Sequence, residues 1–392
     1  MKVAVVFYRI DPEVGGGFTF SRTVLDAVRQ AAPQTGHEFI FYTALGAGQE
    51  ASEFRQIPAN RRHRWHKGAL RAMRTVQDLL GASRWRFRTW FERSLDTEGV
   101  DMVWFATNFA EECDLPFVFT LFDLAHLEHP WFPEVSHNGE WERREHHYRR
   151  FLPKAAAVIV PNKAGAEELK RHFSIGDGRI LILGHPTPGF ALEGDDRPAL
   201  RAVLDEHGIR QPYLFYPAQF WAHKNHLTLV ETLAVLRARG RDFQAVCVGS
   251  DRGQLDHVRS LARQLRVHGA VHLLGFVDTD ELIGLYKHAH ALVYLSFFGP
   301  ENLPPLEALA LGCPVVAAAV HGAREQLGNA ALLVPPTDPE GVADAIERLE
   351  DEQLRAELRT RGRRRVSEVT PAAYVEGVIN FLDRFERIRA CW

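Results

Sequence analysis

Short apolar runs of strand length alternate with helical segments along almost the whole chain, and this alternation restricts the fold more than any other feature. In the first half, the apolar runs occupy residues 2–8, 38–43, 102–106, 117–122 and 156–160. Helical segments lie between several of them, for example at 140–151 and 163–172. Alternation of this kind predicts a mainly parallel sheet with helices on both faces.

A Gly- and Pro-rich stretch at 184–198 divides the chain, and a second alternating series follows it. Because 392 residues are too many for one ordinary core, we expect two domains. We predict an α/β fold with two doubly wound, Rossmann-like domains, 1–190 and 191–370, that face each other across a cleft. Ligands bind such sheets at the carboxyl ends of the strands, so the cleft is the expected site.

Composition argues against several classes of protein. The formal net charge of −3 provides no general attraction to nucleic acid. The four cysteines are scattered, so we expect no disulfide or zinc framework and a reducing, cytoplasmic compartment. The chain enters an apolar strand directly, without the pattern of a signal peptide. Its longest uncharged apolar run, 308–320, is shorter than the roughly 18–20 residues that a membrane-spanning helix needs.

Residues 61–93 are rich in arginine, lysine and aromatic side chains. Three interpretations remain open. The segment is a solvated helical face with some core residues, a peripheral surface that rests on the anionic inner face of the cell membrane, or a patch that binds an acidic acceptor such as a lipid diphosphate.

Residues 297–312 join two apolar runs through a loop that opens a short helix. Prolines are tolerated there because the first backbone N–H groups of a helix have no internal partner. These N–H groups and the helix dipole predict an anion site, to which the loop residues Gly299, Asn302 and Leu303 contribute. Glu307, in the first turn, is placed to accept hydrogen bonds from a diol. A phosphate next to a diol is the outline of a nucleotide.

Other candidate residues also follow predicted strands. Lys224 is placed to meet a diphosphate, and its alternative is a solvent-exposed lysine. The remaining candidates form three groups. Glycines after strands, one of them followed by a serine, allow close approach to a phosphate; a loop pair contacts a base; and a histidine lies at the ligand end of the first sheet. In this order they are Gly16, Gly17, Gly249 with Ser250, then Phe276 and Val277, then His126. Plain turns and a surface histidine are their alternatives. The Gly15–Gly17 run is not Gly-x-Gly-x-x-Gly, which disfavours hydride transfer with a nicotinamide cofactor.

Taken in order, these motifs resemble the family-4, retaining glycosyltransferases of the GT-B fold, over nearly the whole chain. The run from Tyr216 to His226 and the run from Pro304 to Gly312 carry most of the resemblance. The Gly-Pro-x-Asn-x-Pro-Pro-Leu-Glu and Asp-Leu-x-His patterns are similar to a branch that builds bacterial O-antigen and other surface polysaccharides. The last segment, 371–392, resembles the family's helix that crosses back to the first domain.

The sequence departs from the family pattern at three positions that matter for the site. At one of them, Phe122 stands before Asp123 where the family usually has a histidine. Gly299 stands where the family commonly has the first of two glutamates, and Glu301, two residues further on, is the candidate replacement. Gln219 stands where a phosphate-binding arginine is common.

The resemblance implies a retaining hexosyltransferase. It would move a mannose- or rhamnose-type sugar, or a similar hexose, from a nucleoside-diphosphate sugar to a hydroxyl of a glycan or lipid-linked glycan acceptor. Lys224, His126 and Glu301 would act at the reacting centre, and Glu307 would hold the ribose. We expect no metal or other cofactor, because protein charges would stabilise the leaving diphosphate. Two alternatives remain: a catalytically degenerate protein that only binds, and a nucleotide-sugar epimerase.

Overall fold

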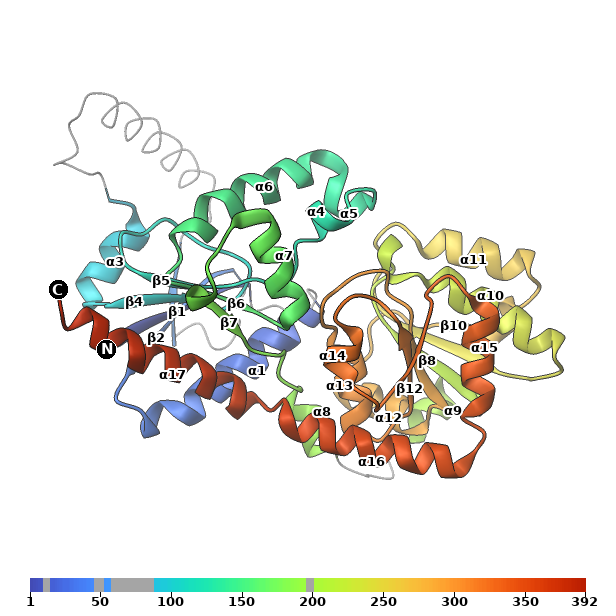
Figure 1. The fold of residues 1–392 in the computed structure, drawn as a ribbon. Coiled ribbons are helices and arrows are strands. Elements are labelled where there is room, and N and C mark those ends of the chain that lie inside the picture. Colours follow the sequence, from blue (N-terminus) through green and yellow to red (C-terminus); the bar gives the residue numbers. More distant parts are fainter. Residues whose placement is uncertain (10–14, 46–52, 58–87, 195–200) are drawn as a thin grey trace.

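The computed structural model describes residues 1–9, 15–45, 53–57, 88–194 and 201–392. They form two α/β domains arranged next to each other (Figure 1), as the alternation of strands and helices predicts. Of the basic segment 61–93, residues 61–87 lie outside the described residues. Its last residues begin α3, whose first turn is capped by Thr89 and Glu92 in a reciprocal capping box.

The first domain contains a seven-stranded sheet in which every neighbouring pair is parallel. In spatial order its strands are β3 (Phe54–Gln56), β2 (Glu38–Leu45), β1 (Lys2–Arg9), β4 (Met102–Phe105), β5 (Phe117–Thr120), β6 (Ala157–Val160) and β7 (Ile180–Ile182). The helices described in this domain are α1 (Gly16–Ala31), α3 (Trp90–Glu98), α4 (Ala125–Glu128), α5 (Pro133–Ser136), α6 (Glu140–Phe151) and α7 (Lys163–Phe173).

The second domain contains a six-stranded sheet, again parallel throughout. Its strands are β10 (Val271–Leu273), β9 (Gln244–Val248), β8 (Tyr213–Pro217), β11 (Ala291–Tyr294), β12 (Val315–Ala318) and β13 (Leu332–Val334). Its helices, with the one that links the domains, are α8 (Gly189–Glu193), α9 (Ala202–Glu206), α10 (His226–Ala238), α11 (Leu255–Gln264), α12 (Thr279–His288), α13 (Leu303–Ala310), α14 (Ala323–Leu327), α15 (Pro339–Arg348) and α16 (Glu352–Glu368).

The last helix, α17 (Pro371–Arg389), leaves the second domain and packs on the first (Figure 1). Its buried residues Tyr374, Val378 and Leu382 share a hydrophobic cluster with α1 and with Val3 and Val5 of β1. The chain therefore passes between the domains twice, once at residues 184–194 and once before α17.

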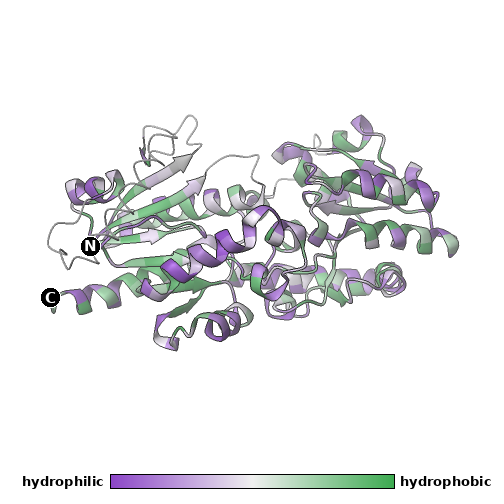
Figure 2. Ribbon diagram, turned by 90° about the horizontal axis from the view of Figure 1, so that it is seen from above, coloured by the Kyte–Doolittle hydropathy of each residue, from purple (hydrophilic) through white to green (hydrophobic). Residues whose placement is uncertain are grey.

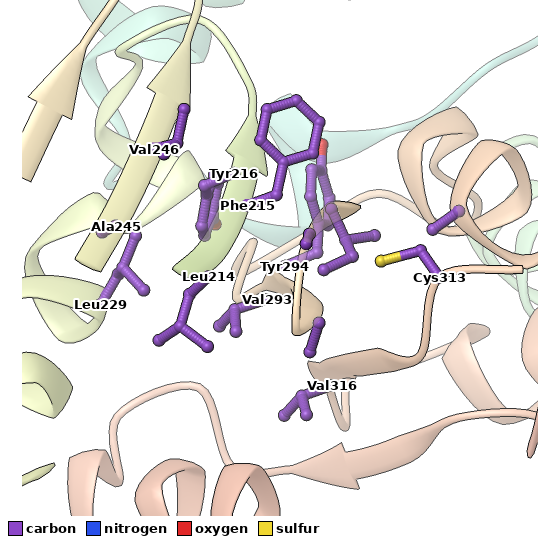
Figure 3. Packing of buried hydrophobic residues seen from close by; sticks show 14 of the residues in the cluster. Leu214, Phe215, Tyr216, Leu229, Ala245, Val246, Val293, Tyr294, Cys313 and Val316 are labelled. Carbon is purple, nitrogen blue, oxygen red and sulfur yellow. The ribbon is translucent and has the colours of Figure 1, made fainter. Parts of the chain in front are cut away.

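Hydrophobic residues are concentrated in the strands, whereas the helices carry both hydrophobic and hydrophilic residues (Figure 2). Because side chains alternate along a strand, Val3 and Val5 of β1 face α1 and α17, whereas Ala4 and Val6 belong to the cluster on the opposite face. In the second domain, residues of β8, β9, β11 and β12 form one cluster (Figure 3). Among the described residues, no helix is both long and apolar enough to cross a membrane.

Candidate functional site

The order of strands marks where a ligand should bind. In the second sheet, β8 lies between β9 and β11, and the strand order changes direction there. In doubly wound sheets, ligands bind outside the carboxyl ends of the two strands at such a switch point. The loop after β8 carries Lys224, and the loop after β11 leads to α13. The sequence analysis assigned its main phosphate-binding residues to these two loops.

The structure brings Lys224 and Asn302 together. The Lys224 Nζ donates to the Tyr294 hydroxyl at 2.8 Å and to Asn302 Oδ1 at 3.2 Å. An ammonium has three N–H donors, so one is left over. No carboxylate pairs with Lys224 among the described residues. A half-buried cation with neutral neighbours and a spare donor is well suited to an anion.

A buried tyrosine holds the two loops in register. The Tyr216 hydroxyl donates to the carbonyl of Lys224 and accepts a hydrogen bond from the Leu295 N–H at 2.9 Å. The Tyr216 and Tyr294 rings stack with centroids 5.5 Å apart (Figure 3). The position of Lys224 is therefore fixed by the packed core beneath it.

The entrance to α13 has a backbone conformation that requires a glycine at position 299. Gly299 has φ +116°, and a Cβ there would lie 2.9 Å from Asn302 Nδ2. Asn302 is further held by Gln326, which accepts from its N–H at 3.2 Å and donates to its carbonyl at 2.7 Å. Leu303 is buried and belongs to a cluster built mainly from the first domain. The predicted contact of these backbone groups with a phosphate remains a prediction.

Glu307 lies in α13 and is buried with 6% of its surface exposed. Its Oε2 accepts a hydrogen bond from the Tyr286 hydroxyl at 2.6 Å. Burial raises the pKa of Glu307 to about 7, and the hydrogen bond from Tyr286 opposes this shift. Its carboxylate is anchored on one side, and its predicted role at a ribose remains a prediction.

The remaining strand-end candidates lie at the same edge of the second sheet. The Gly249 N–H donates to the Gly275 carbonyl at 2.7 Å, so the loops that carry Ser250 and Phe276 are adjacent. A Cβ on Gly249 would lie 2.3 Å from the Ala218 carbonyl oxygen, so no other residue fits there. Phe276 is 76% exposed, and the adjacent Val277 is buried.

The glycine-rich loop of the first domain reaches this edge. A Cβ on Gly15 would lie 3.6 Å from the Nε2 of Gln219, which also donates to Ser250 Oγ at 3.1 Å. Gly16 and Gly17 follow at the start of α1, as the sequence analysis expects for amides that approach from the opposite domain. Whether they bind a phosphate remains a prediction.

Contacts between the domains involve residues that the sequence analysis missed. The Asn162 Nδ2 donates to the Pro300 carbonyl at 2.6 Å, while its Oδ1 caps α7. Gly322 has φ +88°, and a Cβ there would lie 2.5 Å from the Pro300 oxygen. Asn162 reads as an ordinary helix cap in the sequence, and nothing local indicates that it also bonds to a loop of the second domain.

A second contact lies next to Lys224. Glu134 of α5 accepts hydrogen bonds from the backbone N–H of His223, at 2.8 Å, and from its imidazole. Burial lowers the pKa of His223 to about 4, so the ring is neutral at pH 7. The Phe298 ring stacks on His223 at 4.1 Å and on His129 of the first domain at 5.3 Å. These hydrogen bonds and ring contacts therefore hold the α4–α5 segment of the first domain against the two loops of the second domain that lie next to Lys224.

Two further residues that are predicted to be catalytic have buried side chains. His126 is fully buried, and its Nε2 contacts Glu145 of α6 at 3.3 Å. Burial lowers its pKa. The side chain of Glu301 is 4% exposed and accepts a hydrogen bond from the backbone N–H of His185 in the linker. The geometry does not support Glu301 as a substitute for a catalytic glutamate, because its carboxylate is directed to the linker. The predicted contact of His126 with a sugar remains a prediction.

Family models match both halves of the chain. "Glycosyltransferase Family 4" matches residues 21–187, and "Glycosyl transferases group 1" matches residues 203–365. The chain is 27% identical over 237 residues to O-antigen chain mannosyltransferase B of Escherichia coli, covering 59% of this chain and 61% of that protein. It is 26% identical over 215 residues to alpha-D-kanosaminyltransferase of Streptomyces kanamyceticus, covering 54% of this chain and 55% of that protein. These matches therefore span little more than half the length of either relative.

Solved structures share the arrangement of both domains. WaaG, a glycosyltransferase involved in lipopolysaccharide biosynthesis, has a TM-score of 0.69 at 18% identity, with 97% of this chain and 99% of that chain covered. Anabaena HepE, in a complex with UDP, has a TM-score of 0.70 at 16% identity, with 98% and 100% covered. At these identities the likeness concerns the fold alone.

Proposed function

Because the chain belongs to the family-4 glycosyltransferases and has their GT-B fold, we propose that it transfers a hexose from a nucleoside-diphosphate sugar to an acceptor hydroxyl, with retention of configuration. The acceptor we propose is a glycan or lipid-linked glycan of a surface polysaccharide, built at the cytoplasmic side of the membrane. The similarity to an O-antigen mannosyltransferase supports this class of product and favours a mannose-type sugar.

The proposal rests on the surroundings of the Lys224 ammonium group. Its ammonium is held by two neutral oxygen atoms, has no acidic partner among the described residues, and lies at the switch point of the second sheet. Departure of a nucleoside diphosphate builds negative charge at the phosphates while the sugar becomes cationic. A preorganised cation stabilises that charge without having to reorient during the reaction.

The other residues have supporting roles in this proposal. Glu307, anchored by Tyr286, accepts hydrogen bonds from the ribose diol once it is ionised. Gly16 and Gly17 bring backbone amides from the first domain to the phosphates. Gln219 occupies the position next to this loop and offers an amide where the family commonly has a cation. Positive charge at the diphosphate is therefore concentrated on Lys224.

Nucleotide binding provides the first test. We would measure thermal unfolding with UDP, GDP and dTDP, since a ligand at 100 times its Kd adds about 2.7 kcal/mol of stability. One of the three should raise the Tm in the parent and raise it far less in Lys224→Ala. If none of them changes the Tm, the proposal that the second domain holds a nucleoside-diphosphate donor fails.

Product analysis separates this function from its two alternatives. A transferase releases nucleoside diphosphate from the donor faster when acceptor is present and yields a longer glycan. An epimerase converts the donor sugar without any acceptor. A degenerate protein binds the nucleotide and turns over neither substrate.

A further inference from the structure

A cavity of about 270 Å³ lies on the outer side of the loop that carries Lys224. The first two turns of α10, the start of α11 and the loops after β8, β11 and β13 enclose it. None of the donor-site candidates lines this cavity. Its volume is close to the lower end of small-ligand pockets, roughly 300 Å³. It therefore has room for a small group such as one sugar ring.

The side chains that line the cavity are of two kinds. Trp221 and Phe297 supply aromatic rings, and Thr228, Glu231, Gln254 and Thr337 supply hydrogen-bonding groups; we call these six residues the aromatic pocket. Apolar walls with a few polar groups are typical of small-molecule sites. A pyranose matches both kinds, because its C–H face packs on an aromatic ring and its hydroxyls bond to carboxylates and amides.

The wall of the aromatic pocket is already ordered. The Trp221 Nε1 donates to Gln219 Oε1 at 3.0 Å, and the Arg252 guanidinium lies 5.6 Å from the centroid of the Trp221 ring. A fixed ring loses little conformational freedom when a ligand binds, so more of the contact energy appears as affinity.

Charge among the residues that line the cavity disfavours a phosphate; the Arg252 guanidinium lies over the Trp221 ring but does not belong to this lining. Glu231 faces the cavity without an ion pair to any described residue. The one histidine in the cavity lining, His226, is neutral at pH 7 because burial lowers its pKa to about 3. A lone carboxylate repels anions and accepts hydrogen bonds from hydroxyls. The expected ligand is therefore neutral and rich in hydroxyl groups.

The aromatic pocket also lies close to the junction of the domains. The Phe297 ring is 5.5 Å from the ring of Phe132 in the first domain, measured between centroids. Trp221 lies two residues before His223, which bonds to Glu134 of that domain. A glycan that enters between the domains would run close to this pocket.

We propose that the aromatic pocket is a subsite for one neutral sugar residue of the acceptor glycan, some distance along the chain from the reacting hydroxyl. This inference rests on the proposed transferase function. It assigns acceptor recognition to the second domain, in addition to the donor site there.

The direct test is saturation-transfer NMR on the full chain, without donor, against mono- and disaccharides of mannose, rhamnose, glucose, galactose and N-acetylglucosamine. At least one probe should bind, and Trp221→Ala should weaken its binding at least fivefold, with Glu231→Gln also weakening it. The matched control is Trp392→Ala, since Trp392 is equally aromatic and 76% exposed at the other end of the molecule. Nucleoside-diphosphate affinity within twofold of the parent shows that each variant is folded.

The outcomes separate this inference from the proposed function. If transfer occurs but no probe binds, or Trp221→Ala binds every probe as the parent does, the subsite is refuted and the transferase stands. A raised KM for acceptor with unchanged KM for donor in Trp221→Ala supports the subsite. Saccharide binding that depends on Trp221, in a protein that transfers no sugar, refutes both the function and the acceptor role.

Discussion

Replacing Glu301 with glutamine distinguishes a residue of the domain junction from a catalytic one. The Glu301 side chain is almost fully buried and receives the backbone N–H of His185. Burial raises its pKa from 4.5 to about 8. A glutamine keeps the oxygen that accepts this hydrogen bond and cannot ionise. We therefore expect Glu301→Gln to fold, to retain transferase activity within about threefold, and to change how stability depends on pH.

Proton linkage determines whether the stability rises or falls with pH. Between pH 4.5 and 8 the unfolded chain has lost the Glu301 proton while the folded chain retains it, so the folded state binds more protons and stability falls as pH rises. Each unit of difference in pKa corresponds to about 1.4 kcal/mol. For a shift to about 8, the loss between pH 5 and pH 8 is about 3–4 kcal/mol, and Glu301→Gln should lack it.

The assay is urea denaturation of parent and variant at pH 5, 6, 7 and 8. We would compare the free energies of unfolding of parent and variant at each pH. All other titrating groups are the same in the two proteins, so the difference reports on Glu301. Glu376→Gln is the control, because that side chain is exposed and forms no ion pair with a described residue, so the substitution should change the free energy of unfolding by no more than about 0.5 kcal/mol. A Glu301→Gln difference that is the same at pH 5 and pH 8 refutes the assigned burial. A loss of activity of 100-fold or more refutes the structural role and restores the catalytic one.

Three further predictions concern Lys224, the contact between Glu134 and His223, and the close approach of Gly322 to Pro300. Lys224→Ala should lower kcat/KM about 10²–10³-fold, because it removes charge stabilisation at the leaving diphosphate; an unchanged steady-state value would exclude the residue from the mechanism. Glu134→Ala should make the amide of His223 exchange with solvent at least tenfold faster, as seen by mass spectrometry, and equal exchange would mean that the contact between the domains is not made in solution. Gly322→Ala should cost about 1–3 kcal/mol in urea denaturation, since its φ is +88° and its Cβ would meet the Pro300 carbonyl; a cost near zero would contradict the close approach.

Most of the regular structure could be predicted because its signals are local. The helices predicted at 140–151 and 163–172 are present as α6 and α7, and α7 begins where the side chain of Asn162 accepts a hydrogen bond from the N–H of Gly165. Strands β3 and β7 are not among the predicted strands. β3 has a single apolar residue, Phe54, and therefore carries little strand signal, whereas the apolar β7 has the same length as β10 and β13. The places of β3 and β7 are decided by pairing with β2 and β6, which the local sequence does not encode.

The candidate site was only partly predictable, for a related reason. Lys224 and Asn302 follow neighbouring strands of one sheet, so alternation of strands and helices is enough to place both near the same edge. Glu301 lies next to Asn302 in sequence but is directed to His185. The backbone at Asn302 is extended, with φ −133° and ψ 135°, and successive side chains on extended backbone point to opposite sides. The partners Glu134 and Asn162 come from the other domain, and their roles depend on how the two domains are arranged.

Two of the contacts between the domains have different consequences for donor binding. The hydrogen bond between the His185 N–H and Glu301 joins the second domain to the linker. At this place the covalent chain limits how far the two domains can move apart. Glu134 with His223 joins the α4–α5 segment to the turn that presents Lys224, far from any covalent connection. If a donor enters beside Lys224, it must do so next to this second contact. Because no covalent connection lies near this contact, we expect it to open for substrate more readily than the contact between Glu301 and His185, which the linker holds in place.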